Sequence, residues 1–390
     1  MNMHELSRFS VFTDIIFGMH SSGQLGQECK RLGATKVGVV TDSVVAAILG
    51  EALDSFGKSG LPYVVYDQAS TDPTDEDINR AAIFLKEKGC DCVVTVGGGS
   101  ALCTGKGAAF MATNEGSIVD YEEKGKRRRP SLPCLAIPTT AGSGSEVSRI
   151  TPITNSKTNI KSGIFGDAPR VALLDPLLLK TVPRGQAVAS GVDALTHCVE
   201  SFTSKRATPL TDCIALKGME MIGRSFCSSV LGDDLNAKGE MLFASMVANI
   251  ACGNAGLGLS HALNGGFTYL YRARGYKPVA YGDLHAICLP LVMEFNLPAA
   301  EEKFAHMALA LGADGKGGRR EMATKSITKV KEVFTALNTL YKLPWEAIPA
   351  DEMEAVAELT LNTPLAEVNP RRANKTEIVS LVQKALEGWR

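Results

Sequence analysis

Hydrophobic residues show two different patterns of spacing along the first half of the chain. Short runs rich in valine indicate strands that are buried on both faces, and they lie at residues 36–42, 63–67, 92–100, 134–140 and 171–176. Around them, apolar residues recur at helical spacing in segments that end in glycine, at residues 21–33, 44–60 and 75–89. Such alternation predicts a doubly wound, Rossmann-like α/β domain. Residues 148–154 and 160–166 have the pattern of a β-hairpin.

The pattern changes near residue 182, beyond which hardly a strand signal remains. Long segments rich in Ala, Leu and Met follow at helical spacing, for example residues 211–226 and 238–256. We therefore expect an α/β domain over residues 1–182 and an all-α domain over residues 183–390. The charged run at residues 122–130 is expected to be a solvated turn.

The composition narrows the class of partner. Apolar residues make up 45% of the chain and charged residues 21%, which is typical of a globular protein. The 41 basic and 42 acidic residues nearly cancel, which argues against nucleic acid or an anionic membrane as the main partner. The ten cysteines show no CxxC spacing and are expected to be buried thiols in a reducing compartment. With no signal peptide and no apolar run of about 20 residues, we expect a cytoplasmic protein.

A glycine-rich turn follows the third of the predicted strands, in VVTVGGGSALCTGK. Gly97, Gly98 and Gly99 allow a ligand to approach the backbone, and Ser100 begins a helix whose N–H groups suit an anion. The turn has neither the GxGxxG spacing nor the Walker A spacing. It therefore favours either a phosphate site or a plain tight turn.

Two further signals lie at the ends of neighbouring strands. The loop PTTAGSGSE offers the hydroxyls of Thr139, Thr140 and Ser143, at a sheet edge where α/β proteins bind ligands. Asp42 ends the first strand, where an acidic residue either accepts hydrogen bonds from ribose hydroxyls or caps the next helix. Together with the glycine turn, these residues favour dinucleotide binding.

Asp193 and His197 are the first candidates for metal chemistry. In SGVDALTHCVES they lie four residues apart, which places both side chains on one face of a helix. A carboxylate and an imidazole at this spacing suit Zn²⁺ or Fe²⁺. The same spacing suits an ion pair or a helix cap, so the spacing alone leaves both interpretations open.

Six motifs in this order give the chain a family resemblance: GGGSALCTGK, PTTAGSGSEVS, LLDP, GVDALTHCVES, LGLSHALNGGF and CLPLVMEFN. They resemble the iron-containing (group III) alcohol dehydrogenases over nearly the whole chain. The resemblance implies a dehydroquinate-synthase-like fold, with an NAD(P)-binding α/β domain, a helical domain and an active site in the cleft between them. It also implies hydride transfer between nicotinamide and an alcohol or aldehyde, a divalent metal that polarises the substrate oxygen, and at least a dimer.

The resemblance assigns roles to individual residues. Asp193 and His197 match the first two metal ligands of the family, and His261 matches the third. The expected metal is Fe²⁺, with Zn²⁺ or another divalent ion as an alternative. The residues that match cofactor contacts are Gly97, Gly98, Gly99, Ser100, Thr139 and Thr140, with Lys106 as the lysine after the glycine turn and Asp42 as the acid that favours NAD over NADP.

The chain departs from the family pattern at three positions. Cys103 replaces an aspartate of the helix after the glycine turn. Gly265 replaces a second histidine near the nicotinamide, four residues after the third ligand. Tyr281, followed by Gly282, occupies the place of the fourth ligand, which is normally histidine. A candidate proton relay and one metal ligand are therefore in doubt.

His285 offers a replacement for the fourth ligand because it follows Tyr281 by one helical turn and shares its face. The alternatives are Asp283, a water molecule, or a histidine that only lines the cleft. Tyr281 and His285 are also the candidates for relaying the substrate proton.

The segment between His261 and Tyr281 is longer than the family norm and carries Arg272, Arg274 and Lys277. Guanidinium groups suit carboxylate or sulfonate tails, so a small anionic aldehyde is one hypothesis and a solvated basic loop is the other. The competing functions are a metal-free reductase of the same superfamily, similar to maleylacetate reductase, a dehydroquinate-synthase-like lyase, and a non-catalytic NAD-binding protein.

Overall fold

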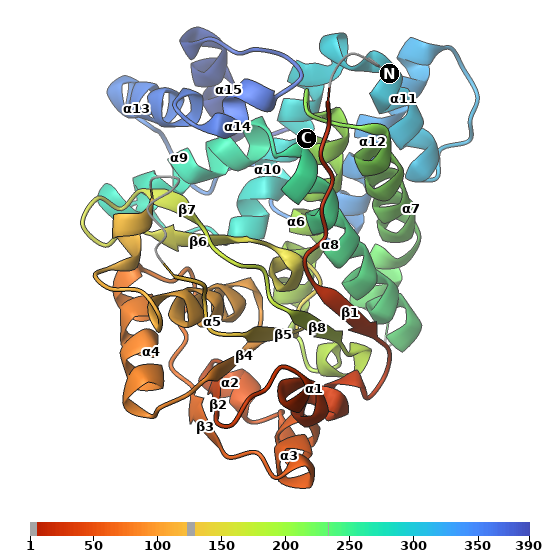
Figure 1. The fold of residues 1–390 in the computed structure, drawn as a ribbon. Helices are drawn as coiled ribbons and strands as arrows, with labels where there is room; N and C mark the ends of the chain where they lie inside the picture. Colours follow the sequence, from red (N-terminus) through yellow and green to blue (C-terminus); the bar gives the residue numbers. More distant parts are fainter. Residues whose placement is uncertain (1–5, 123–128, 233) are drawn as a thin grey trace. The chain divides into compact units, whose positions relative to one another are not determined.

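The chain forms two compact units in the computed structural model, which describes residues 6–122, 129–232 and 234–390 (Figure 1). One unit spans Val11–Val182, and the other joins Pro183–Arg390 to the N-terminal residues up to Ser10. Ser10 groups with the helical unit because its N–H donates to Asn254 Oδ1 at 2.8 Å, and Asn254 Nδ2 donates back to its carbonyl at 3.1 Å. Most of the predicted charged turn, at residues 123–128, lies outside the described residues.

The first unit contains a six-stranded sheet in the order β1-β8-β5-β4-β2-β3, in which each strand runs parallel to its neighbours. The strands are β1 (Asp14–Phe17), β2 (Val37–Val40), β3 (Tyr63–Tyr66), β4 (Cys92–Gly97), β5 (Cys134–Pro138) and β8 (Val171–Leu174). The helices are α1 (Leu25–Arg31), α2 (Ser43–Ala46), α3 (Gly50–Ser59), α4 (Asp75–Glu87) and α5 (Gly99–Met111). The predicted doubly wound domain is confirmed.

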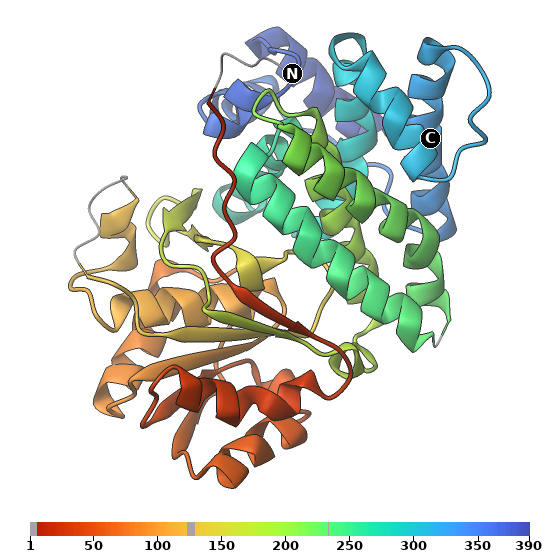
Figure 2. The ribbon, with the colours of Figure 1, turned by 45° about the vertical axis from the view of Figure 1, so that its right-hand side comes forward.

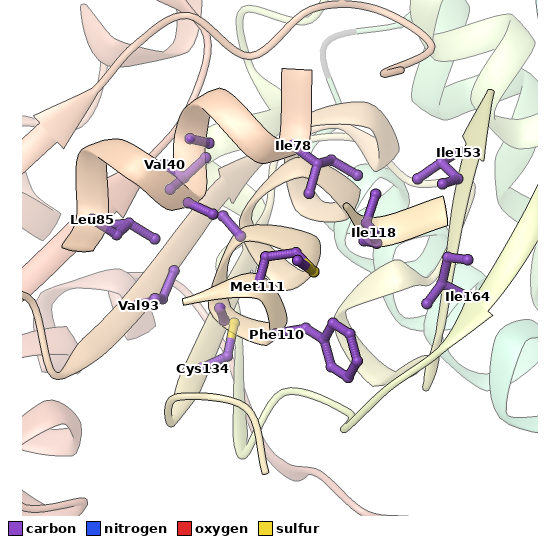
Figure 3. Packing of buried hydrophobic residues seen from close by; sticks show 14 of the residues in the cluster. Val40, Ile78, Leu85, Val93, Phe110, Met111, Ile118, Cys134, Ile153 and Ile164 are labelled. Carbon is purple, nitrogen blue, oxygen red and sulfur yellow. The ribbon is translucent and has the colours of Figure 1, made fainter. Parts of the chain in front are cut away.

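Alternate side chains of the strands build a core on each face of the sheet. Val40 and Val93 pack with apolar residues of α4 and α5 (Figure 3), whereas Val39 and Val94 pack with residues of α1 and α3. The order in which strands are added to the sheet reverses between β2 and β4. Strand β3 pairs with one edge of β2, and β4 pairs with the other edge of β2. Parallel α/β sheets bind ligands at the carboxyl ends of strands at such a point.

Of two further predictions for this unit, one is confirmed and the other is wrong. The predicted hairpin is confirmed, since β6 (Ile150–Thr154) and β7 (Lys161–Phe165) pair antiparallel. The single helix predicted over residues 44–60 is wrong, because α2 ends at Ala46 and α3 begins at Gly50. Short 3₁₀ turns complete the unit: η1 (Ser21–Gln24), η2 (Ile118–Tyr121), η3 (Ser145–Val147) and η4 (Pro176–Leu179).

The second unit is helical, as predicted, and its described residues contain no strand (Figure 2). Its helices are α6 (Arg184–Thr203), α7 (Pro209–Leu231), α8 (Leu235–Ala255), α9 (Leu259–Ala273), α10 (Tyr281–Asn296), α11 (Glu301–Ala310), α12 (Arg319–Ala336), α13 (Ala350–Leu361), α14 (Pro364–Val368) and α15 (Lys375–Glu387), with the 3₁₀ turn η5 (Leu297–Ala299). Helices α6, α7 and α8 pack against one another, and α10 packs against both α6 and α9.

Within the described ranges, no single helix is both long and apolar enough to cross a membrane. The pair α8 and α9, bent by 96°, passes the same test together, by length and composition only. All ten cysteines are free thiols, and seven of them are buried.

Candidate active site

Three helices bring one carboxylate and three imidazoles together inside the helical unit. Asp193 and His197 lie one turn apart on α6, and His197 Nε2 is 3.7 Å from Asp193 Oδ1. His261 on α9 and His285 on α10 each place Nε2 3.6 Å from the same oxygen. All four side chains are buried. Asp193 Oδ1 is therefore the common centre of the cluster.

A glycine contact positions His285. A Cβ atom on Gly282 would lie 2.0 Å from the carbonyl oxygen of Ala189 on α6, so only glycine lets α10 come this close. Gly282 lies three residues before His285, and Ala189 lies four residues before Asp193, so each pair shares a helix face. The close backbone contact thus stands one turn away from the contact between His285 and Asp193.

The donor atoms of the cluster suit a metal ion. Asp193 Oδ1 and His261 Nε2 are buried and have no hydrogen-bond partner, which costs about 1–3 kcal/mol per atom. The ligating atoms of Asp193, His261 and His285 all lie within 4.8 Å of one another. One carboxylate oxygen with imidazole nitrogens is a donor set that both Fe²⁺ and Zn²⁺ accept. The residues therefore fit the divalent metal that the resemblance implies.

The charges of the cluster shift its pKa values in opposite directions. Burial would raise the pKa of Asp193, but His197, His261 and His285 outweigh burial and hold it below its usual range. Burial would lower the pKa of His261, but Glu200 and Asp193 outweigh it and raise the pKa to about 9. In the metal-free cluster, attraction between the Asp193 carboxylate and the imidazolium form of His261 thus favours the charged form of each.

The side chains around Asp193, His261 and His285 bear on which residue could be the fourth metal ligand. The ring of His197 stacks on that of His261 at 4.9 Å between centroids. Tyr281 presents its ring edge-on to His285 at 4.9 Å, so its side chain borders the cluster. Asp283, the alternative ligand, is not part of the group of possible metal ligands found among the described residues. Its side chain is half-buried, and burial raises its pKa. His285 is thus placed as the sequence suggested, while its role as a ligand remains to be tested.

Two residues behind the histidines were missed by the sequence reasoning. Glu200 Oε2 lies 2.6 Å from Nδ1 of His261, and Ser260 Oγ lies 2.9 Å from Nδ1 of His285. A signal for Glu200 was present, because it follows Asp193 by seven residues and His197 by three. This is the spacing of residues on one helix face.

The basic segment before α10 is more helical than expected. Helix α9 continues to Ala273, so the longer segment extends this helix and leaves only residues 274–280 outside it. Arg272 lies on α9, and Arg274 Nε is 3.9 Å from Glu352 Oε1. Lys277 is exposed, and its carbonyl accepts a hydrogen bond from Trp345 Nε1 at 2.9 Å. The charge of Arg274 is thus partly matched within the unit.

In the α/β unit, the predicted cofactor residues gather at the carboxyl ends of β2, β4 and β5. Gly97 has φ 143°, and a Cβ atom there would lie 2.7 Å from Ala101 Cβ and 3.6 Å from Asp42 Oδ2. A Cβ atom on Gly99 would lie 2.8 Å from Ser143 Oγ, and one on Gly98 would lie 3.4 Å from Thr140 Cγ2. The N–H of Thr139 donates to the carbonyl of Gly97 at 3.0 Å.

Asp42 caps the next helix, which is one of the two interpretations that the sequence left open, and its contact with a ribose stays a prediction. Its Oδ1 caps α2 by accepting from the N–H groups of Val44 at 3.0 Å and Val45 at 2.9 Å, while Oδ2 faces Gly97. Helix α5 begins beside it without a side-chain cap, which leaves its first N–H groups available to an anion. Ser100 Oγ accepts from the N–H of Asp72 at 3.1 Å.

Lys106 is buried next to the glycine turn but points at backbone oxygens. Its ammonium group donates to the carbonyls of Ser145 at 3.0 Å, Ser148 at 3.1 Å and Ile150 at 2.8 Å. Burial lowers the pKa of Lys106 and raises the pKa of the neighbouring Glu146 to about 7. Because an ammonium has three hydrogens, this geometry uses all of its donors on the loop after β5 and on the first residue of β6. A contact between Lys106 and a cofactor stays a prediction.

Comparison with known proteins identifies the class to which this fold and its histidine cluster belong. The family model described as iron-containing alcohol dehydrogenase matches residues 13–176, and the model described as Fe-containing alcohol dehydrogenase family, C-terminal, matches residues 187–386. The chain belongs to the iron-containing alcohol dehydrogenase family, and the predicted enzyme class is confirmed.

Individual relatives cover nearly the whole chain. The 1,3-propanediol dehydrogenase of Citrobacter freundii is 33% identical over 377 residues, covering 95% of this chain and 96% of the relative. The NAD-dependent methanol dehydrogenase of Bacillus methanolicus is 29% identical and covers 98% of this chain and all of its own length. A crystal structure of 1,3-propanediol oxidoreductase superposes with a TM-score of 0.92 at 31% identity, covering 98% of this chain and 100% of that one.

Proposed function

We propose that this protein is an NAD-dependent and metal-dependent dehydrogenase that interconverts a small alcohol and its aldehyde. The observation that carries the proposal is the pair of buried atoms without hydrogen-bond partners, Asp193 Oδ1 and His261 Nε2, at the centre of the histidine cluster. The names of two relatives support it, since one is an NAD-dependent methanol dehydrogenase and another a 1,3-propanediol dehydrogenase.

Asp193, His197, His261 and His285 would hold the metal, with Fe²⁺ proposed first and Zn²⁺ or another divalent ion as the alternative. Such an ion supplies a Lewis acid for the oxygen of an alcohol or aldehyde. The side chains themselves orient the substrate and move its proton. Because His285 Nε2 faces Asp193, we assign the proton relay to Tyr281, whose ring borders the cluster.

The α/β unit would bind the dinucleotide where the strand order reverses, at the carboxyl ends of β2 and β4. The uncapped start of α5 suits the pyrophosphate, and the hydroxyls of Thr140 and Ser143 and the backbone N–H of Thr139 lie beside the glycine turn. Asp42 Oδ2, next to Gly97, would accept from ribose hydroxyls and repel a 2′-phosphate, which favours NAD over NADP.

The substrate is proposed to be small, and an anionic tail is the finer hypothesis. Arg272, Arg274 and Lys277 are the groups that would bind such a tail. The contact of Arg274 with Glu352 reduces the positive charge of this segment. A comparison of kcat/KM for neutral and carboxylate-bearing aldehydes of equal length tests this hypothesis, which fails if the neutral compounds are preferred.

We also propose a cytoplasmic homodimer. Strand β1 lies at the edge of the sheet, and the preceding residues Val11 and Phe12 expose 46% and 54% of their surface. The last strand of a sheet, flanked by exposed apolar side chains, can associate with a second copy. Sedimentation equilibrium of the full chain measures the stoichiometry, and a monomer at micromolar concentration would contradict the proposal.

The function is tested by metal content and NADH oxidation of anaerobically purified protein. We expect about one iron or zinc per chain in the wild type, loss of that metal in His285→Ala, and loss of aldehyde-dependent NADH oxidation with it. The expected loss follows from the 3.6 Å approach of His285 Nε2 to Asp193 Oδ1. Metal retained in His285→Ala would remove this residue from the ligand set.

The same assay separates the rival functions. A wild type that stays metal-free after reconstitution yet oxidises NADH with a substrate would point to the metal-free reductase. A wild type that binds NADH but turns over no aldehyde would point to the non-catalytic binding protein. Either result would overturn the proposed metal-dependent dehydrogenase.

A further inference from the structure

We infer that Glu200 is a positioning residue that fixes His261 in the tautomer whose Nε2 is free to bind a metal, and that it does so while capping the helix which carries His261. This inference deepens the proposed function and rests on it, because the metal is part of that proposal. Glu200 lies on α6, seven residues after Asp193, and only 3% of its surface is exposed.

The contact between Glu200 and His261 decides where the imidazole proton sits. Glu200 Oε2 and His261 Nδ1 are 2.6 Å apart, and both side chains are buried. An ionised carboxylate only accepts hydrogen bonds, so the hydrogen in this contact belongs to Nδ1. In the neutral ring the lone pair then lies on Nε2, the atom that faces Asp193 Oδ1 at 3.6 Å and has no hydrogen-bond partner.

The same carboxylate holds the beginning of α9. Glu200 Oε2 accepts from the N–H of Gly258 at 2.9 Å, and Oε1 accepts from the N–H of Ser260 at 2.6 Å. Gly258 is the N-cap residue and has no side chain of its own to do this. A Cβ atom there would lie 3.0 Å from Glu200 Oε1, so glycine is what allows the carboxylate to reach the helix. Helix α9 is thus fixed relative to α6 through one side chain.

Through Ser260, Glu200 also supports the second imidazole of the trio. Ser260 is fully buried, its N–H is bound by Glu200, and its Oγ lies 2.9 Å from Nδ1 of His285. Glu200 therefore orients two histidines through their Nδ1 atoms, His261 directly and His285 through Ser260. The Nε2 atoms of both rings face Asp193 Oδ1. Hydrogen bonds of this kind raise the metal affinity of the ligand they orient by roughly 10–100-fold.

A purely structural role is the alternative, and Asn369 provides the matched control. Its Oδ1 accepts from the N–H of Leu259 at 3.3 Å, so it caps the same end of α9. No hydrogen bond or ion pair found among the described residues joins its side chain to His261. A substitution at Asn369 therefore weakens the helix end and leaves the imidazole contact in place.

The experiment combines metal affinity with side-chain NMR on the full chain. Zn²⁺ affinity is measured by chelator competition for the wild type, Glu200→Gln and Asn369→Ala, with the thermal midpoint of each metal-free protein. We expect Glu200→Gln to bind Zn²⁺ roughly 10–100-fold more weakly, because the amide cannot accept all three hydrogen bonds. Asn369→Ala is expected to lower the thermal midpoint and to keep near wild-type affinity.

Long-range ¹H–¹⁵N spectra of the metal-free wild type, recorded above the pKa of about 9 of His261 so that its ring is neutral, give a second measurement that needs no variant. We expect His261 to carry its proton on Nδ1, and a neutral ring protonated on Nε2 would overturn the inference even if Glu200→Gln does not fold. Equal loss of affinity in both variants, or none in Glu200→Gln, would also overturn it. A wild type that binds no metal would refute the proposed function instead, while the tautomer would still decide the role of Glu200.

Discussion

Replacing Asp193 by asparagine is expected to remove the bound metal and to lower aldehyde-dependent NADH oxidation by roughly 10²–10⁴-fold. The range corresponds to about 3–5 kcal/mol, in line with the several kcal/mol of transition-state charge stabilisation that a metal ion supplies. Asp193 Oδ1 is the atom toward which three histidines converge, at 3.6–3.7 Å. Asparagine keeps the shape of the side chain and removes its charge, so the variant tests the charge rather than the packing.

The measurement is metal per chain by elemental analysis, with NADH absorbance as the activity assay. Asp212→Asn is the matched control, because it removes a carboxylate of the same unit that pairs with Lys303 at 2.9 Å and takes no part in the cluster. One equivalent of metal in Asp193→Asn, with activity like that of the control, would show that the carboxylate is dispensable.

Replacing Gly282 by alanine is expected to lower the free energy of unfolding by about 1–3 kcal/mol and to deplete the metal as well. The new Cβ atom would lie 2.0 Å from the carbonyl oxygen of Ala189 and 2.5 Å from its carbonyl carbon. Because these are backbone atoms, α10 has to move away from α6 as a whole. His285 moves with it and leaves Asp193.

Gly265→Ala is the control for this substitution, since Gly265 also lies in a helix but a Cβ atom there meets nothing within 4 Å. Alanine is favoured over glycine inside a helix by about 0.5–1 kcal/mol, so this variant should gain a little stability. Urea unfolding and metal content are measured for both. If Gly282→Ala equals Gly265→Ala in both, the close approach of α10 to α6 does not position the ligand.

Local patterns in the sequence were sufficient for much of the fold. The strands at Val37–Val40, Cys92–Gly97 and Cys134–Pro138 were predicted because buried parallel strands are continuous valine-rich runs. The helical second unit followed from the 3.6-residue spacing of its apolar residues. The break between α2 and α3 was missed, because residues 44–60 keep helical spacing across it.

The sequence predicted those parts of the candidate site whose geometry is set within a single helix. Asp193 and His197 share a face because four residues make about one turn, and that much is fixed by the covalent chain. His261 entered only through the family resemblance. Nothing local in the sequence relates it to α6.

Only the tertiary structure decided what lies between helices. The contact of Gly282 with Ala189 brings His285 to Asp193, and the reach of Glu200 across to α9 orients His261. Both depend on the distance between two packed helices, which is set by many side chains at once rather than by spacing along one segment. The sequence by itself therefore determined the order of the elements and the face of each helix, and the packing determined which faces meet.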